Sequence, residues 1–466
     1  MGVSLVWFRN DLRLTDHPAL AAAVAAGQPI VPIYILDEET PGLRALGGAS
    51  RWWLHHSLLS LDASLRAIGS RLTLRQGAAE RVLMEVAEAT HASGLYWNRA
   101  YDRPSRERDA RLKGSFRARG LTAESFNGNL LFEPWEIKTG AGGPFQVFTP
   151  FWRACRSGHP PAKPLPAPTN LPTPAKWPAS DKMDEWKLLP VTPDWAGGLR
   201  DSWIPGEPAA AERLDVFLES QLESYRAGRD IPAIDATSRL SPHLAFGEIS
   251  PRRIWHTASA TRGTAALDKF LSEIGWREFS YHLLFHHDDL ARRNFRPSFD
   301  AFPWIDDNPA LEAWQGGRTG YPLVDAGLRE LWTTGWMHNR VRMIAGSFLV
   351  KDLMIDWRAG ERWFWDTLVD ADPANNAASW QWVAGCGADA APFFRIFNPL
   401  LQAEKFDPDG DYVRRWLPEL AHLPGARIHR PWLADLSGSV YPSPIVDHAA
   451  ARSRALATFQ SLKKAS

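Results

Sequence analysis

The sequence of 466 residues contains very little cysteine, with only Cys155 and Cys386. Two cysteines cannot form the disulfide framework of a small secreted protein, and no CxxC pair is present to hold zinc. We therefore expect a reduced, cytoplasmic setting and no metal site.

Long apolar runs are also absent. None approaches the roughly 18 residues that a membrane-spanning helix needs. The first residues, MGVSLVWFRNDLR, lack the apolar region of a signal peptide. We expect no membrane association and no secretory signal.

No excess of charge of one sign is present, because 53 basic residues balance 53 acidic ones. This excludes a strongly basic chain, although a local basic patch can still bind nucleic acid. The phosphate-binding motifs GxGxxG and GxxxxGK[ST] are missing as well. A nucleotide cofactor would therefore need another kind of site.

What the chain has in unusual quantity is tryptophan, with 23 residues against 8 tyrosines. Two of them, Trp380 and Trp382, lie two residues apart in the segment ANNAASWQWVAG. Such a pair among small residues either fills a core or provides a platform for a flat ligand.

The first 130 residues alternate short apolar runs with helical patterns. Val3–Phe8 and Ile30–Leu36 predict buried strands, with a helix at 18–26 between them. After a second helix at 50–68, further strands are predicted at 72–75, 94–98 and 121–126. This rhythm predicts an α/β fold with a doubly wound parallel sheet, similar to a Rossmann domain.

After this region the amino-acid composition and the hydrophobic pattern of the chain change. Residues 158–208 are rich in proline and lack a sustained period, which is typical of an extended linker, and the pattern from Ala209 onward is mostly helical. A chain of this length is too long to fold around a single hydrophobic core. We expect an α/β domain at 1–130, a linker at 131–208 and a large all-α domain at 209–466.

The segment TSRLSPHLAFGEISPR begins with a predicted helix start at Ser241-Pro242, where serine would be the N-cap and proline the first helical residue. Thr237 and Ser238 place hydroxyl groups just before it. Free amides and hydroxyls suit a phosphate or diphosphate. A plain capped helix is the alternative.

The segment at 266–290 predicts a helix with an apolar core face and a tryptophan on the opposite side, among polar residues. The core face comprises Leu267, Phe270, Leu271, Ile274 and Tyr281. Trp276 lies among Lys269, Glu273 and Ser280. The indole stacks on a ligand, with Glu273 accepting hydrogen bonds, or it is a surface residue covered by a loop. His282 and His286 lack an evident third ligand for a metal.

The segment at 335–350 predicts another amphipathic helix. Its core face comprises Val341, Ile344, Ala345 and Phe348. On the opposite face, Asn339 offers a donor and an acceptor, Met343 a soft apolar surface, and Gly346 room for a ligand to approach. An ordinary helix with a basic edge is the alternative.

Two carboxylates, Asp370 and Asp372, precede Asn376 in an apolar neighbourhood. Buried carboxylates need partners, and Arg342 is a plausible one for this pair. The arginines of the chain could also form a basic surface, although such charges are usually just solvated.

In this order, the segments resemble the cryptochrome/photolyase family over nearly the whole chain. The resemblance begins at WFRNDLRLTDHPAL and closes with RIFNPLLQAEKFD. Between them lie TSRLSPHLAFGEISPR, EIGWREF, GRTGYPLVDAGLRELWTTGWMHNRVRM and DWRAGERWFWDTLVDADPANNAASWQW. The part GRTGYPLVDAGLRELW is also similar to plant cryptochromes, which indicates a photolyase branch near those receptors.

The resemblance implies that the helical domain binds FAD. Residues 237–241 would bind its phosphates, Asp370 and Asp372 would face the isoalloxazine ring, and Asn376 would lie beside flavin N5. The implied cofactor-binding residues are Tyr225, Thr237, Ser238, Arg239, Leu240, Ser241, Arg342, Asp370, Asp372 and Asn376.

It also implies light-driven repair by a deoxyribodipyrimidine photo-lyase, a carbon–carbon lyase. Photoexcited reduced FAD would give one electron to a flipped-out cyclobutane pyrimidine dimer in UV-damaged DNA, and the ring would split. The implied catalytic residues are Glu273, Asn376, Trp304, Trp357 and Trp380, the tryptophans forming an electron path to the flavin.

Trp276 and Trp382 match the pair that grips the flipped dimer in repair enzymes. The implied DNA-binding residues are Arg229, Glu273, Trp276, Asn339, Arg340, Met343, Trp382 and Gln402. Asn376 and the run HNRVRM favour dimer repair, since plant cryptochromes carry aspartate at the first position and (6-4) enzymes a histidine-rich run at the second. The alternatives are a cryptochrome photoreceptor and a (6-4) or DASH-type photolyase.

A second chromophore is expected in the α/β domain, either methenyltetrahydrofolate or 8-hydroxydeazaflavin. Trp52, Trp53 and His55 are candidates for contacting it. We expect a monomer without an obligate protein partner.

Overall fold

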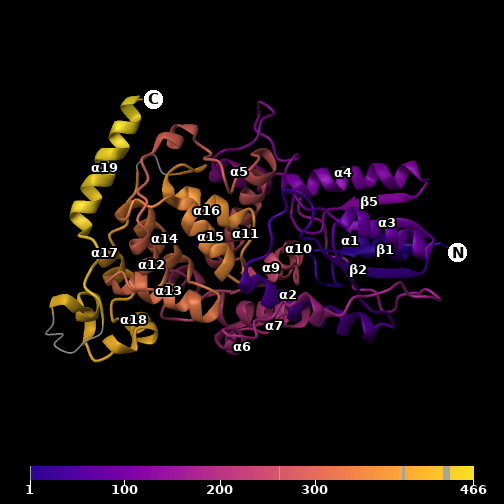
Figure 1. Ribbon diagram of the computed structural model, residues 1–466, viewed down its shortest axis with the longest axis horizontal. Coiled ribbons are helices and arrows are strands. Elements are labelled where there is room, and N and C mark those ends of the chain that lie inside the picture. The colour runs from indigo at the N-terminus through magenta and orange to yellow at the C-terminus, as the bar shows by residue number, and fades with distance from the viewer. Residues whose placement is uncertain (1, 262, 391–393, 434–440, 466) are drawn as a thin grey trace. The chain divides into compact units, whose positions relative to one another are not determined.

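Five parallel strands form the sheet that the apolar runs predict, in the order β3-β2-β1-β4-β5. The computed structural model of the chain describes residues 2–261, 263–390, 394–433 and 441–465 (Figure 1). The strands are β1 (Val3–Phe8), β2 (Ile30–Leu36), β3 (Thr73–Gln76), β4 (Ala92–Asn98) and β5 (Thr122–Phe126). The predicted doubly wound α/β architecture is confirmed, with β1 and β2 at their predicted bounds.

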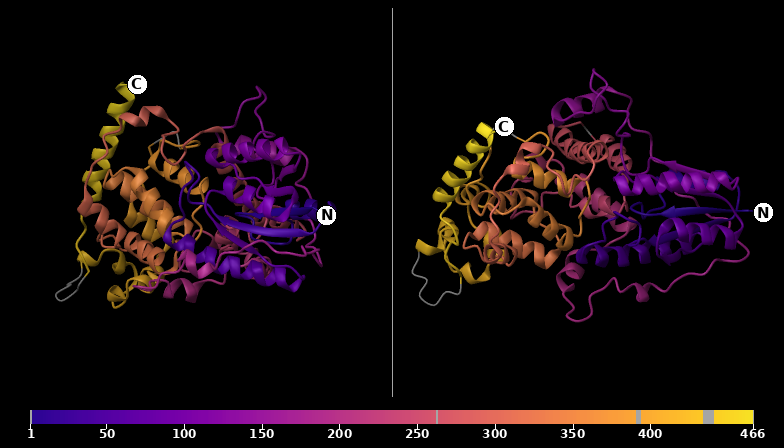
Figure 2. Two further views of the ribbon diagram at one scale, coloured as in Figure 1. Left: turned by 45° about the vertical axis from the view of Figure 1, so that its right-hand side comes forward. Right: turned by 45° about the horizontal axis from the view of Figure 1, so that its top comes forward.

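Helices cover both faces of this sheet. They are α1 (Pro18–Ala25), α2 (Gly48–Ala67), α3 (Ala79–Thr90) and α4 (Arg103–Ala118). In the right-hand view of Figure 2 the strands lie between the dark-blue helix α2 and the purple helix α4. The core includes Leu5 of β1, Val31 of β2 and Leu95 of β4, which share one register and are fully buried. Continuous apolar strands of this kind are typical of a parallel sheet buried on both faces.

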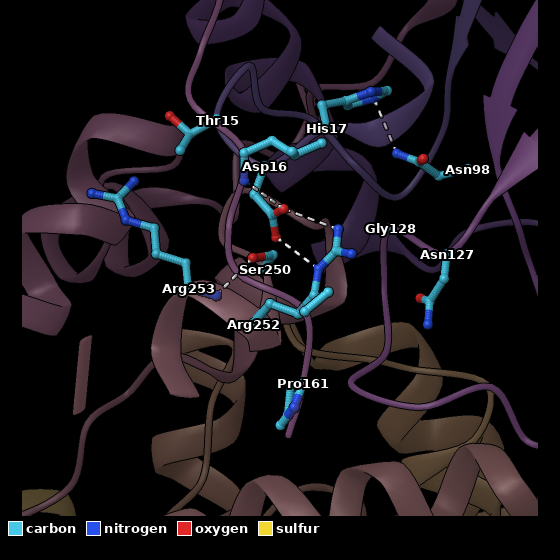
Figure 3. A network of polar contacts seen from close by, with 12 residues as sticks. Thr15, Asp16, His17, Asn98, Asn127, Gly128, Pro161, Ser250, Arg252 and Arg253 are labelled. Carbon is cyan, nitrogen blue, oxygen red and sulfur yellow. Dashed lines mark hydrogen bonds and ion pairs between the residues drawn. The ribbon is translucent and has the colours of Figure 1, made fainter. Parts of the chain in front are cut away.

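The motif that follows β1 forms a buried polar network (Figure 3). Asp16 accepts from the Arg252 guanidinium of α10 (Pro251–Ser259), with a contact at 2.9 Å. The Arg13 guanidinium donates to the carbonyl oxygens of Asp16, Gly128 and Gly247. A Cβ at Gly247, whose φ is +64°, would lie 2.0 Å from a backbone oxygen. The network therefore has a structural role, and glycine is required at this close approach.

The proline-rich segment is extended, as predicted, from residue 158 to 182. It runs along the α/β domain, where Pro172 O accepts from the amide of Ile30, and Asp181 N donates to Leu74 O of β3. The bond to Leu74 covers part of the open edge of β3, and the bond to Ile30 holds the segment at the start of β2. Exposed edges invite pairing with other chains, so this cover protects the sheet.

From residue 209 onward the chain is mostly helical, as predicted, whereas three short helical elements at 148–157, 183–186 and 197–202 lie inside the segment predicted to be a linker. Before residue 289 the elements are α5 (Phe148–Ser157), η1 (Met183–Trp186), α6 (Gly197–Ser202), α7 (Glu207–Val216), η2 (Phe217–Gln221), α8 (Tyr225–Gly228), α9 (Ser241–Ala245), α10 and α11 (Ala265–His286). After it come η3 (Pro297–Ala301), α12 (Asn308–Gln315), α13 (Pro322–Thr334), α14 (Asn339–Ser347), η4 (Phe348–Asp352), α15 (Trp357–Thr367), α16 (Asn375–Ala384), α17 (Pro399–Phe406), α18 (Asp411–Trp416), η5 (Pro418–Leu420), η6 (Gly425–His429), η7 (Pro431–Leu433) and α19 (His448–Ala465).

Contacts divide the chain into two compact units. The first comprises Met1–Ala196, Trp203–Ser220 and Ser238–Asp288, and the second comprises Gly197–Ser202, Gln221–Thr237 and Asp289–Ser466. These units are defined by contacts between residues, whereas the predicted domains are defined by the sequence pattern. The domain boundaries at residues 130 and 208 therefore stay a prediction.

The core faces predicted for the two amphipathic helices are confirmed. Every residue predicted on those faces of α11 and α14 is at most 9% exposed. In the second unit α14, α15 and α16 pack together around one large core, visible in Figure 1 as neighbouring orange helices.

Helix α11 also buries a carboxyl group, that of Glu278. Its Oε2 accepts from the amides of Leu131 at 2.9 Å and Phe132 at 3.3 Å. Burial raises the pKa of this carboxyl to about 7, despite the nearby guanidinium of Arg277. The protonated form therefore predominates in the folded chain below about pH 7.

This raised pKa predicts a pH dependence of stability. The contribution of Glu278 to the free energy of unfolding is fully present below its unfolded pKa of about 4.3, and it is lost as pH rises to about 7. In Glu278→Gln the amide oxygen keeps both hydrogen bonds, so the difference in stability between variant and wild type should grow by about 3 kcal/mol over that range. Urea unfolding at several pH values measures it. The same replacement at exposed Glu185 is the control, and parallel pH curves for Glu278→Gln and wild type would contradict the prediction.

Candidate functional site

An ion pair joins α14 to the loop before α16. Arg342 Nη1 and Nη2 donate to the two oxygens of Asp370 at 3.1 and 2.9 Å. The Asp370 side chain is only 3% exposed, whereas that of Arg342 is 24% exposed. Arg342 Nε also donates to Met337 O, which fixes the plane of the guanidinium. The pair that the sequence predicts is therefore present, in a two-bond geometry that is stronger than a single contact.

The amide of Asn376, in the first turn of α16, is buried and oriented. Its Nδ2 donates to the backbone oxygen of Glu361 at 3.0 Å and to Glu361 Oε1 at 2.8 Å. Within the described part of the chain, Asn376 Oδ1 accepts no hydrogen bond. The amide thus presents an acceptor in a fixed direction, and a ligand that donates an N–H would complete it.

Asp372 holds the beginning of α16. Its Oδ1 accepts from the amides of Ala374 and Asn375 at 2.9 and 2.7 Å, and from Asn375 Nδ2. A carboxylate at a helix N-terminus accepts hydrogen bonds from the free backbone amides there and interacts favourably with the positive end of the helix dipole. Asp372 therefore fixes the helix that carries Asn376, Trp380 and Trp382.

The three tryptophans predicted to carry electrons differ in burial. Trp380 and Trp357 are buried, whereas Trp304 is half-buried and packs on the same core. Trp380 contacts Phe364 of α15 edge to face at 4.9 Å, and its Nε1 has no hydrogen-bond partner among the described residues. Trp357 Nε1 donates to Asn294 Oδ1. A series from buried to partly exposed rings is compatible with the predicted path.

The exposed face of α14 presents Asn339, which is exposed, and Met343, which is half-buried. The predicted role of Gly346 on this face is wrong. A Cβ at Gly346 would contact Val383 at 3.4 Å and Trp380 at 3.6 Å. The position is buried against α16, because α14 and α16 pack closely there, and it leaves no room for a ligand.

The helix start predicted at Ser241 is displaced by one residue. Helix α9 begins at Ser241 with Leu240 as N-cap, and Leu240 O accepts from Leu244 N at 2.9 Å. Arg239 has a φ of +50°, which turns the chain one residue earlier than the Ser-Pro signal indicates. The phosphate-binding role of residues 237–241, and that of Tyr225 as a flavin contact, stay predictions.

Trp276 of α11 is half-buried rather than fully solvated. The ring of Phe148, from α5, stacks on it with centroids 3.8 Å apart and planes at 10°. Glu273, one turn earlier, accepts from Lys269 Nζ at 2.7 Å. The alternative of a covered surface tryptophan is thus partly right, since Phe148 covers one face of the indole.

Two arginines predicted to contact DNA face the same carboxylate. Arg340 Nη2 lies 2.9 Å from Asp230 Oδ1, and Arg229 Nε lies 3.8 Å from that oxygen. His338 is the N-cap of α14, its Nδ1 accepting from Arg340 N, and burial lowers its pKa to about 4. The histidine is neutral near pH 7, as an accepting Nδ1 requires.

Trp382 and Gln402 are half-buried, on α16 and α17. Trp382 Nε1 donates to Asp389 O at 3.1 Å. Glu273, Trp276 and residues 238–241 belong to the first compact unit, and the other predicted site residues belong to the second.

Sequence reasoning missed Glu361, Phe148 and Asp230, which hold Asn376, Trp276 and Arg340 respectively. Phe148 and Asp230 lie far along the chain from their partners, at separations that no local motif encodes, whereas Glu361 is 15 residues from Asn376. Glu361 is the one that a pattern could have found, because its helical spacing places this carboxylate on the same face of α15 as Trp357 and Phe364, where it needs a donor.

Two further expectations concern other ligands. Trp52 and Trp53 lie in the core, and Trp53 Nε1 donates to buried Glu248 at 3.0 Å, which gives these rings a packing role. Among the described residues no group of three His, Cys, Asp or Glu could hold a metal ion. His282 Nε2 instead accepts from Phe145 N.

None of the described helices has both the length and the apolar character that a membrane span requires.

Comparisons with known proteins match almost the whole chain. Residues 4–170 match the family "DNA photolyase", and residues 270–461 match "FAD binding domain of DNA photolyase". A deoxyribodipyrimidine photo-lyase of Agrobacterium fabrum is 54% identical over 99% of this chain and 98% of its own length. Cryptochrome-1 of Arabidopsis thaliana is 42% identical over 97% of this chain and 69% of its own.

Among solved structures, a bacterial class III photolyase from Agrobacterium tumefaciens superposes with a TM-score of 0.96 at 53% identity. It covers 100% of this chain, which covers 98% of it. These similarities extend over both compact units, and the chain belongs to the cryptochrome/photolyase family.

Proposed function

We propose that this chain is a deoxyribodipyrimidine photo-lyase that uses FAD and light to split cyclobutane pyrimidine dimers in UV-damaged DNA. The observation that carries the proposal is the buried amide of Asn376, held by Glu361 with its oxygen open to a donor. Asparagine here resembles repair enzymes and differs from plant cryptochromes. The name of the 54% identical Agrobacterium fabrum protein supports the same activity.

The residues of the second unit fit FAD. Asn376 Oδ1 could accept a hydrogen bond from an N–H of the reduced flavin ring. The Arg342–Asp370 pair places a positive and a negative charge next to the start of α16. The buried Trp380 Nε1, which lacks a partner within the described chain, adds a donor. Asp372, Tyr225 and Thr237 of the same unit would hold other parts of the cofactor.

The chemistry that bound, reduced FAD supplies is one electron, released on absorption of light. Asn376 would accept a hydrogen bond from the flavin without acting as an acid, because an amide has no proton to lose near neutral pH. Glu361 keeps that amide from rotating. Electrons would pass from half-buried Trp304 through buried Trp357 to buried Trp380, which would face the flavin.

DNA binding would use aromatic and polar side chains for the dimer. Trp276, supported from behind by Phe148, offers one indole face for stacking, which contributes about 1–3 kcal/mol per base. Glu273 and Asn339 would hydrogen-bond the dimer edges, and Met343 and Trp382 would pack on it. Arg229, Arg340 and Gln402 would face the phosphate backbone, so affinity should fall with salt.

A cytoplasmic location, a monomeric state and an antenna chromophore, methenyltetrahydrofolate or 8-hydroxydeazaflavin, remain part of this proposal.

Trp276→Ala should weaken binding to dimer-containing DNA by about ten-fold or more, since the stacking platform is lost. Fluorescence anisotropy with a labelled duplex measures it. Trp332→Ala is the matched control: Trp332 is 60% exposed, stacks on Trp363 and has no assigned role. Equal losses in the two variants, or no loss in the first, would count against the platform.

The proposal is tested by incubating reduced protein with three oligonucleotides under blue light and in darkness. One carries a cyclobutane dimer, one a (6-4) photoproduct, and one the dimer in single-stranded form. Light-dependent repair of the duplex dimer supports the proposal. Repair of the (6-4) lesion alone would assign the chain to the (6-4) photolyases, and repair of the single-stranded dimer alone would assign it to the DASH-type branch. Repair of none of the three would favour a photoreceptor.

A further inference from the structure

Asp230 lies beside two arginines of the second compact unit. Its Oδ1 is 2.9 Å from Arg340 Nη2 and 3.8 Å from Arg229 Nε. The Asp230 side chain is 35% exposed and that of Arg340 is 17% exposed. The carboxylate therefore neutralises one of the two positive charges at the edge of the unit, in reach of solvent.

The Arg340 guanidinium is held in place, but not all of its N–H donors have hydrogen-bond partners among the described residues. It lies over the ring of Phe406, 4.4 Å from the centroid, and its buried Nε has no hydrogen-bond partner among the described residues. Only Asp230 accepts a side-chain hydrogen bond or ion pair from it there. A planar group with five donors and one anionic partner can still bind a second anion, and phosphate oxygens match this geometry.

We propose that Asp230 limits the affinity of this surface for DNA phosphodiesters by competing with them for Arg340. The inference rests on the proposed function, which makes Arg229 and Arg340 phosphate contacts. A phosphate that approaches Arg340 meets the negative charge of Asp230 as well, and one guanidinium is shared between two anions. Binding to undamaged DNA, which depends on phosphate contacts, is then weaker than the arginines alone would allow.

Asp230→Asn separates charge from geometry. The amide oxygen of asparagine can still accept from Arg340, so the guanidinium keeps its place over Phe406 while the competing charge disappears. The variant should bind an undamaged duplex several-fold more tightly at low salt. The slope of log affinity against log salt should steepen by up to about 1, the value for one further phosphate contact.

Asp411→Asn is the matched control. Asp411 also pairs with an arginine, Arg414, at 3.2 Å, and its removal changes net charge by the same amount. A general charge effect would appear in both variants. Arg340→Gln, made alone and with Asp230→Asn, closes the cycle: the effect of Asp230→Asn should vanish once Arg340 is gone.

Anisotropy titrations with undamaged duplex at four salt concentrations give the result. Tighter binding and a steeper slope for Asp230→Asn only, lost without Arg340, is the expected outcome. Unchanged or weaker binding by a folded variant would overturn the inference and leave Asp230 as a positioning residue for Arg340. A wild-type chain that repairs no lesion fails the proposed function instead, so the two failures are distinguishable.

Discussion

Arg342→Met should lower the free energy of unfolding by about 3 kcal/mol or more, and the purified variant should lose bound flavin. The reason is the burial of its partner, since the Asp370 side chain is only 3% exposed. Removing one member of such a pair leaves a buried charge without compensation, which costs far more than the pair itself contributes. Urea unfolding measures stability, and the visible spectrum of the purified protein measures flavin content.

A double variant separates the two effects. Arg342→Met combined with Asp370→Leu replaces both charges with apolar groups, which should recover most of the stability but none of the flavin. Arg66→Met is the control: it breaks an exposed pair with Asp62 at 2.6 Å and should change stability by less than about 1 kcal/mol. Flavin retained at wild-type level in the double variant would remove the ion pair from the cofactor site.

Gly360→Ala should be the most damaging small substitution in α15. A Cβ at this position would lie 2.1 Å from the Trp380 indole, and two further ring atoms would lie within 2.6 Å. Both residues are buried, so Trp380 must move or the helices must separate, at a cost of about 3 kcal/mol. Photoreduction of bound oxidised flavin should slow in parallel, because Trp380 is the ring proposed to lie next to it.

Gly114→Ala is the matched control within a helix. Gly114 lies in α4 with nothing within 4 Å of an added Cβ, so alanine there should stabilise the chain by about 0.5–1 kcal/mol through helix propensity. Thermal and urea unfolding of both variants measure the contrast. A stable Gly360→Ala protein with wild-type photoreduction would contradict the placement of Trp380.

The fold was predictable where local pattern and burial agree. β1 and β2 are buried apolar runs bounded by polar or small residues, so their ends could be placed to the residue. The start of α9 could not, since the positive φ of Arg239 overrides the Ser-Pro signal. Gly346 was misplaced for a related reason: helical spacing gives the face of a residue but not which helix packs on it.

The candidate site was predictable in part. The resemblance supplied Asn376 and Arg342, and the need to compensate a buried carboxylate supplied the pair with Asp370. Asp230, which faces Arg340, and Phe148, which stacks on Trp276, depend on packing between elements distant along the chain. Such partners follow from the tertiary structure, so no single-sequence pattern gives them.

The most direct test of the central proposal is repair itself. Reduced protein is mixed with a UV-irradiated oligothymidine that contains cyclobutane dimers, then divided between blue light and darkness, and thymine absorbance is followed in the ultraviolet. Recovery of absorbance in the light only is the predicted result. No recovery by protein shown to hold reduced flavin would contradict the assignment as a dimer photo-lyase.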